Sequence, residues 1–253
     1  MEAALTLEQW LGAELYRLLL VFCRVSTAFM LLPGLGEAQV SVRVRVPAGL
    51  LVAYCIAPLA GPAPAMPGIW AAAAAVALEV ASGAFLGTLS RLLLSAVQVA
   101  GQIIGQSIGI SNAFVFGVGP DSSAVLGATL YAACLVALFA VDGHHLGLRA
   151  LADSYALVPL GMPLPSAAAA RSASEGMAAA FRLAMQLSMP FLILSVLFNV
   201  ALAGINRALP AMPVFMIGAP ALLMVGLHLL EVTAPSLVSE IIAAYGAAIA
   251  LRP

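Results

Sequence analysis

The chain has 253 residues, of which 63% are hydrophobic and only 8% charged, with a mean hydropathy of +1.10 and a net charge of −1. A soluble domain carries about 25% charged residues, so this composition excludes an ordinary soluble protein. The charge also argues against a nucleic-acid partner, because phosphate binding needs a basic face. Long apolar runs without alternation exclude a β-barrel and predict an all-α, multi-span helical membrane protein.

The first apolar stretch covers residues 10–32 and ends at the helix-stopping cluster Pro33-Gly34-Leu35-Gly36. It contains Arg24, which is flanked on both sides by apolar residues. A guanidinium at membrane depth faces protein or water and not lipid. We therefore expect this helix to pack inside an assembly.

A second span is expected at residues 44–60, followed by a loop at 61–68 with three prolines and two glycines. The third span, at residues 69–91, carries Glu79 near its middle. This intramembrane carboxylate again calls for a protein partner or a water-filled cavity.

Residues 92–120 differ in composition from the preceding spans, because several glutamines, serines and glycines interrupt the apolar sequence. Small residues four apart align on one helix face and let two helix backbones approach closely. The expected packing glycines are Gly83, Gly87, Gly101, Gly105 and Gly109. The string from Gly105 to Gly109 also fits the Gly-x-Ser-x-Gly pattern of a hydrolase, which would make Ser107 a nucleophile. That pattern needs a strand-to-helix turn, a His base and an acid, so we favour packing.

A further span is expected at residues 122–141, and residues 142–182 form the longest hydrophilic section. Two more apolar runs, 183–205 and 208–230, should make a helical hairpin around Asn206-Arg207, followed by an amphipathic tail at 231–253. Polar residues of metal-ligand type stand at the ends of these runs. They are Asp142, His144, His145, His228 and Glu231. Because such positions are polar in any membrane helix, we expect no metal site there.

Orientation follows from the arginines, which gather on the cytoplasmic side. If all seven stretches cross and the N-terminus is outside, seven arginines are cytoplasmic and only Arg207 is outside. This bias predicts an N-terminus outside and a cytoplasmic C-terminus. If residues 92–120 fold back without crossing, the bias collapses, so the arginine count favours crossing.

The order of motifs along nearly the whole chain resembles the FliR/SctT family of flagellar and injectisome export-gate proteins. The opening segment, residues 24–58, has an Arg in the first apolar helix, Pro and Gly at its end, and then two further arginines. The middle resembles the family in Asp142-Gly143-His144, Leu151-Ala152-Asp153-Ser154 and Pro159-Leu160-Gly161. The end resembles it in Arg207-Ala208-Leu209-Pro210 and Val225-Gly226-Leu227.

The resemblance implies a single domain over residues 1–253, built of helical hairpins and packed in a hetero-oligomeric export gate. It implies a non-enzymatic subunit in the bacterial inner membrane and the flagellar basal body, with no cofactor. The implied partners are FliP and FliQ, which would form the pore for unfolded polypeptides, with FlhB and FlhA close by. The Asp142-Gly143-His144 string favours the flagellar system. A small-solute transporter, which would also use broken helices and midplane charges, is the alternative.

The resemblance also implies that the loop after Gly109 plugs the closed pore. Residues 110–120 place bulky apolar side chains between glycines, so an apolar obstruction would sit on a backbone that can swing. The expected plug residues are Phe114, Val115, Phe116 and Val118. The other interpretation is a buried turn whose phenylalanines fill a core.

Overall fold

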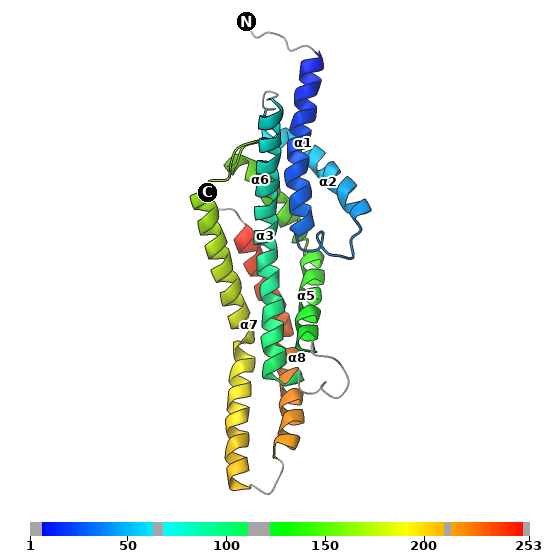
Figure 1. Ribbon diagram of the computed structural model, residues 1–253. Helices are drawn as coiled ribbons and strands as arrows, with labels where there is room; N and C mark the ends of the chain where they lie inside the picture. Colours follow the sequence, from blue (N-terminus) through cyan, green and yellow to red (C-terminus); the bar gives the residue numbers. More distant parts are fainter. Residues whose placement is uncertain (1–6, 63–67, 111–121, 210–213, 250–253) are drawn as a thin grey trace. The chain divides into compact units, whose positions relative to one another are not determined.

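A computed structural model describes residues 7–62, 68–110, 122–209 and 214–249. Over these residues the fold is all-α and contains no strand. The helices are α1 (Leu7–Leu31), α2 (Val42–Ile56), the short 3-10 helix η1 (Ala57–Ala60), α3 (Ile69–Ser107), α5 (Ser122–Ala140), α6 (His144–Leu157), α7 (Ser166–Ala208) and α8 (Val214–Ile249). Figure 1 shows these helices and the order in which the chain visits them.

The chain groups into two compact units, each assembled from separate segments. The first unit comprises residues 1–92, 142–176 and 246–253. Within it, α1 supplies a buried apolar face that includes Val21, Val25 and Phe29, and this face packs with η1 and α6. Gly36, after the end of α1, lies against the backbone of Met30 and Leu32, so the predicted stop at residues 33–36 is confirmed.

The second unit comprises residues 93–141 and 177–245. Its core contains Ile104 and Ile108 of α3 and Phe191 of α7, with leucines of α5 and α8 packed against them. The predicted hairpin is present here, because α7 ends at Ala208 and α8 begins at Val214. The two helices approach closely where a Cβ atom added at Gly218 would lie 2.5 Å from the Leu202 side chain.

Three helices continue further than the sequence predicts. Residues 69–91 and 92–107 form one helix, α3, because no proline interrupts it and its glycines are tolerated within a helix. The run 183–205 is part of α7, which begins at Ser166 after the last proline of the preceding loop. The expected tail from residue 231 is the second half of α8, which accommodates Pro220 and Pro235.

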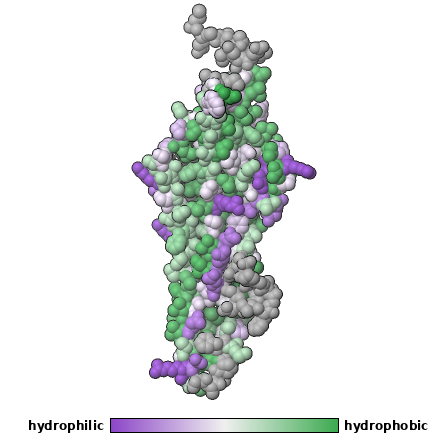
Figure 2. Space-filling model, viewed as in Figure 1, coloured by the Kyte–Doolittle hydropathy of each residue, from purple (hydrophilic) through white to green (hydrophobic). Residues whose placement is uncertain are grey.

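The span count changes accordingly. Four helical segments in the described residues are long and apolar enough to cross a membrane: Val42–Ala60, Ile69–Ser107, Ser166–Ala208 and Met216–Gly246. A fifth exists if the bent pair Val125–Ala140 and His144–Leu157 counts as one span. The expectation of seven separate crossings is therefore wrong. Many large apolar side chains stay exposed, among them Trp70, Val136 and Met216, and Figure 2 shows a mostly hydrophobic face.

Candidate functional site

The most developed polar site surrounds Arg24, whose side chain is completely buried on α1. Its Nε donates a hydrogen bond to Oε2 of Glu79 at 2.6 Å, and its Nη2 donates to Oε1 of the same carboxylate at 3.1 Å. Glu79 lies on α3 and is also completely buried. The two charges predicted to need protein partners are thus partners of each other, in a bidentate pair.

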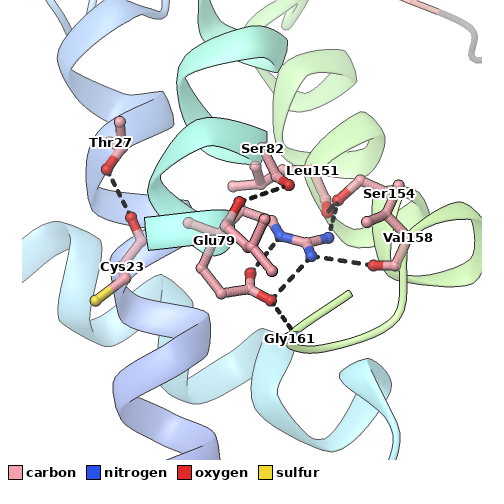
Figure 3. A network of polar contacts seen from close by, with 10 residues as sticks. Cys23, Thr27, Glu79, Ser82, Leu151, Ser154, Val158 and Gly161 are labelled. Carbon is pink, nitrogen blue, oxygen red and sulfur yellow. Dashed lines mark hydrogen bonds and ion pairs between the residues drawn. The ribbon is translucent and has the colours of Figure 1, made fainter. Parts of the chain in front are cut away.

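The guanidinium of Arg24 has further partners from the end of α6. Nη1 donates to the Ser154 hydroxyl at 3.1 Å, and Nη2 donates to the Val158 carbonyl at 3.0 Å (Figure 3). The Ser154 hydroxyl donates its own proton to the Leu151 carbonyl, so its oxygen is free to accept from Arg24. The Tyr155 ring lies 4.0 Å from the guanidinium carbon, a cation–π distance.

Glu79 is held from a second side as well. Its Oε1 accepts a hydrogen bond from the backbone N–H of Gly161 at 2.7 Å. Gly161 has a φ of +72°, a left-handed conformation that glycine adopts without strain, and this turn aims its N–H at the carboxylate. The network therefore ties α1, α3, α6 and the turn after α6 together; we call these six residues, Arg24, Glu79, Ser154, Tyr155, Val158 and Gly161, the Arg24 clamp.

The clamp suits a structural role better than a catalytic one. Both oxygens of Glu79 accept hydrogen bonds, and Arg24 is engaged through all three of its nitrogens. A cavity of about 210 Å³ adjoins the site, and its walls are mostly apolar side chains such as Phe85, Leu86 and Leu164. A carboxylate held in this way is a poor general base, because its lone pairs are already occupied.

Three of the five expected packing glycines lie against another helix. A Cβ atom added at Gly83 would collide with the backbone oxygen of Arg24, and one added at Gly87 would lie 2.6 Å from the Leu31 Cβ. These two glycines thus face α1. A Cβ at Gly101 would lie 2.5 Å from the Cα of Gly127 on α5. Gly109 differs, since no atom of the described residues lies within 4 Å of a Cβ added there, and its φ is +81°, just after the end of α3. Gly105 is buried.

Ser107 stands at the last residue of α3, where its hydroxyl donates to the Ile103 carbonyl at 2.7 Å. This is an ordinary helix contact, and α3 leads into the position from a helix and not from a strand. The geometry of a nucleophile elbow is therefore not formed at Ser107.

The polar residues at the span ends form two small groups. The ligand-type atoms of Asp142, His144 and His145 lie within 4.8 Å of one another, at the start of α6. His228 Nδ1 lies 3.4 Å from the carboxylate of Glu231, and both side chains are exposed. Because the first group sits at a helix N-terminus, whose partial charge is positive, the position disfavours a cation.

The expected plug residues, Phe114, Val115, Phe116 and Val118, lie outside the described residues. Three further members of the clamp stand in or beside the motifs of the sequence, but nothing in those motifs assigns them a role: Ser154, Val158 and Gly161. Val158 and Gly161 act through a backbone carbonyl and a backbone N–H, which leave no mark on a sequence. The Ser154 hydroxyl is visible in the sequence, but no local pattern links it to Arg24, 130 residues away.

Comparison with known proteins gives a consistent result. Residues 15–247 match the family described as bacterial export proteins, family 1. The flagellar biosynthetic protein FliR of Caulobacter vibrioides is 32% identical over 225 residues, which cover 87% of this chain and 89% of that protein. The protein of the same name from Escherichia coli is 30% identical over 233 residues, covering 89% and 85%. The Bacillus subtilis protein is 28% identical over 209 residues, covering 80% of each. On this evidence, the chain belongs to family 1 of the bacterial export proteins, the family that includes flagellar FliR.

Proposed function

We propose that the chain is a non-enzymatic subunit of the flagellar type III export gate, which forms with FliP and FliQ homologues the pore for unfolded flagellar proteins. The gate would lie in the bacterial inner membrane, within the flagellar basal body, with FlhA and FlhB homologues close by. The alternative function, a small-solute transporter, remains an outcome of the experiment below.

The observation that carries this proposal is the match over residues 15–247, together with the flagellar relatives at 32% and 30% identity. It supports a component of a flagellar export apparatus. The four helical segments that are long and apolar enough to cross a membrane support a membrane-embedded position for that component.

Two features of the structure favour a subunit of a larger assembly. First, α3 has 39 residues and α7 has 43, so at 1.5 Å per residue they are roughly 58 and 65 Å long, about twice the thickness of a hydrocarbon core. The excess length lies outside that core, and exposed apolar side chains on these helices, such as Val99, Met177 and Phe181, favour cover from other protein. Second, Met216, Ile217 and Met224 of α8 are exposed in the isolated chain, and methionine packs well against irregular partner surfaces.

The test is purification of the chain from its native membrane through a C-terminal affinity tag, in a strain whose own copy has been deleted. We expect FliP and FliQ homologues to co-purify in fixed ratio and flagellin secretion to depend on the tagged copy. An equally abundant, unrelated membrane protein with the same tag is the control. If the tagged chain restores secretion but co-purifies without either homologue, the shared pore is wrong. If deletion leaves secretion intact and abolishes uptake of a solute, the transporter is right.

A further inference from the structure

The cavity of about 210 Å³ beside the Arg24 clamp lies wholly within the first unit. Apart from Arg24, its walls come from α3, from the end of α6 with the loop that follows, and from the start of α7. Most of the wall is apolar and includes Phe85, Leu86, Leu157 and Leu164. A molecule that fills this space must therefore be largely apolar as well.

Three buried polar side chains set the cavity apart from an ordinary gap in packing. Arg24 is completely buried, Ser82 is 2% exposed and Ser154 is 3% exposed, and all three line the cavity. Tyrosine and cysteine aside, six polar side chains are buried in the described part of the chain, so half of them surround this one space. Burying polar groups is costly, and their concentration here favours an occupant that forms a hydrogen bond.

Arg24 has a donor to offer such an occupant. A guanidinium carries five N–H groups. The clamp uses the one on Nε, both on Nη2 and one on Nη1, and the second N–H of Nη1 has no acceptor among the described residues. The hydroxyls of Ser82 and Ser154 donate to the carbonyls of Leu78 and Leu151, so their protons are already used. The occupant should accordingly carry an acceptor oxygen.

The occupant should also be uncharged. Glu79 already neutralises Arg24 through two hydrogen bonds. A second carboxylate in the cavity would compete with Glu79 and leave an excess negative charge buried, while a cation would be repelled by the guanidinium. A neutral ether, ketone or alcohol oxygen avoids both costs.

The volume limits the size of the occupant. An apolar protein cavity of about 150 Å³ holds benzene, so a cavity of about 210 Å³ has room for roughly eight or nine heavy atoms. A ring suits so small a space, because it has few torsions to immobilise on binding.

We propose that this cavity is a ligand site for an uncharged ring compound of eight or nine heavy atoms, whose acceptor oxygen takes the remaining N–H of Arg24. The inference goes beyond the proposed function and does not depend on it. A bound ring would touch α3, α6 and the start of α7 together, and so it would stabilise the folded chain by mass action.

Two probes of the same shape test the hydrogen bond. Acetophenone has nine heavy atoms and a carbonyl oxygen, and α-methylstyrene is its isostere with a CH₂ group in place of that oxygen. Each is titrated calorimetrically into the purified full chain in detergent. We expect acetophenone to bind at least tenfold more tightly, because its oxygen meets a charged donor, and benzoate not to bind. Equal dissociation constants for the two isosteres, or no binding of acetophenone, would overturn the proposal.

A pair of variants tests the position of the site. Ala169→Leu places a larger side chain on a half-buried wall residue, and Ala170→Leu makes the same change at the next residue, which is exposed and outside the lining. We expect the first change to abolish acetophenone binding and the second to leave the dissociation constant within twofold of wild type. Because both variants share the same detergent, uptake of the probe by micelles cancels. Unchanged binding in folded Ala169→Leu would place the ring elsewhere and refute the site; the comparison of isosteres in the wild type stands even if this variant fails to fold.

Discussion

Arg24 and Glu79 show what a buried charge requires in an apolar helix. Taking a guanidinium and a carboxylate out of water costs several kcal/mol for each ion, and their attraction offsets this cost only when the remaining donors and acceptors are also satisfied. Here Ser154, Val158 and Gly161 satisfy them. The clamp is thus a unit in which each member makes the burial of the others tolerable.

Removing one charge should therefore destabilise more than removing both. Arg24→Ala leaves Glu79 buried without a counter-ion, so we expect a loss of about 3–5 kcal/mol in the free energy of unfolding. The double variant Arg24→Met, Glu79→Leu should lose less. Denaturant unfolding in detergent, monitored by tyrosine and tryptophan fluorescence, measures the free energy of unfolding of both variants. Arg171→Ala, at an exposed position of α7, is the control and should shift stability by less than about 0.5 kcal/mol. A double variant as unstable as the single one would contradict this reasoning.

The plug remains a prediction from the sequence. Replacing Phe114 and Phe116 with serine should hydrate an apolar constriction, so the assembled gate would leak small ions while still exporting protein. Ion flux into vesicles that contain the purified complex measures the effect. An assembled variant whose flux equals that of the wild type would favour the buried turn over the plug.

At the scale of helices, glycines set how closely α3 approaches its neighbours. Gly83 faces the backbone of Arg24, which cannot move aside as a flexible side chain could, and Gly101 faces the backbone of Gly127. Both contacts lie within a unit, one in each. The positions of these glycines follow from backbone contact and not from a need for unusual backbone angles.

Gly83→Ala should consequently push α3 away from α1 and weaken the clamp, at a cost of about 1–3 kcal/mol. Gly12→Ala is the matched control, because it lies on α1 with nothing within 4 Å of an added Cβ, and alanine favours a helix. Thermal unfolding of the two variants in the same detergent checks the difference. Equal melting temperatures would mean that the close approach at Gly83 contributes nothing.

The sequence was sufficient to predict an all-α fold and the ends of some helices. It was not sufficient to predict which helices continue without a break. The stop at residues 33–36 and the hairpin near Asn206 carry strong local signals, and the structure has both. The sequence changes from apolar to glutamine-rich at residue 92, which predicts the end of a helix there. The structure has one continuous helix, α3, across this residue, because a change of composition alone does not break a helix. Arg24 and Glu79 each stand out in the sequence as a charge within an apolar run. Their pairing could not be predicted, because they lie 55 residues apart and meet only when α1 packs against α3.

For the whole chain, the revised span count gives a sharper prediction of topology. With residue 65 outside and four spans, the chain before Val42 lies in the cytoplasm, so the N-terminus changes side relative to the seven-span topology. Arg207 then lies outside and the loop and terminal arginines lie in the cytoplasm, which keeps the arginine bias; these are Arg43, Arg45, Arg149, Arg171 and Arg252. Counting the bent pair as a fifth span removes the bias. We therefore expect reporter fusions at residues 65 and 253 to score outside and inside. Scores on the same side would show that the pair crosses as one span.

The lengths of α3 and α7 also bear on how cells keep such a protein in the correct amount. Each helix exceeds the hydrocarbon core by roughly half its length, so in a newly made copy without the proposed partners part of each helix lies outside that core, and both helices carry exposed apolar side chains such as Val99, Met177 and Phe181. Surfaces of that kind attract chaperones and proteases, which remove the unassembled copy before it can aggregate. If the chain is the gate subunit proposed above, excess copies would then be short-lived and assembled ones long-lived, which would tie the abundance of the chain to that of its proposed partners without any regulator of its synthesis.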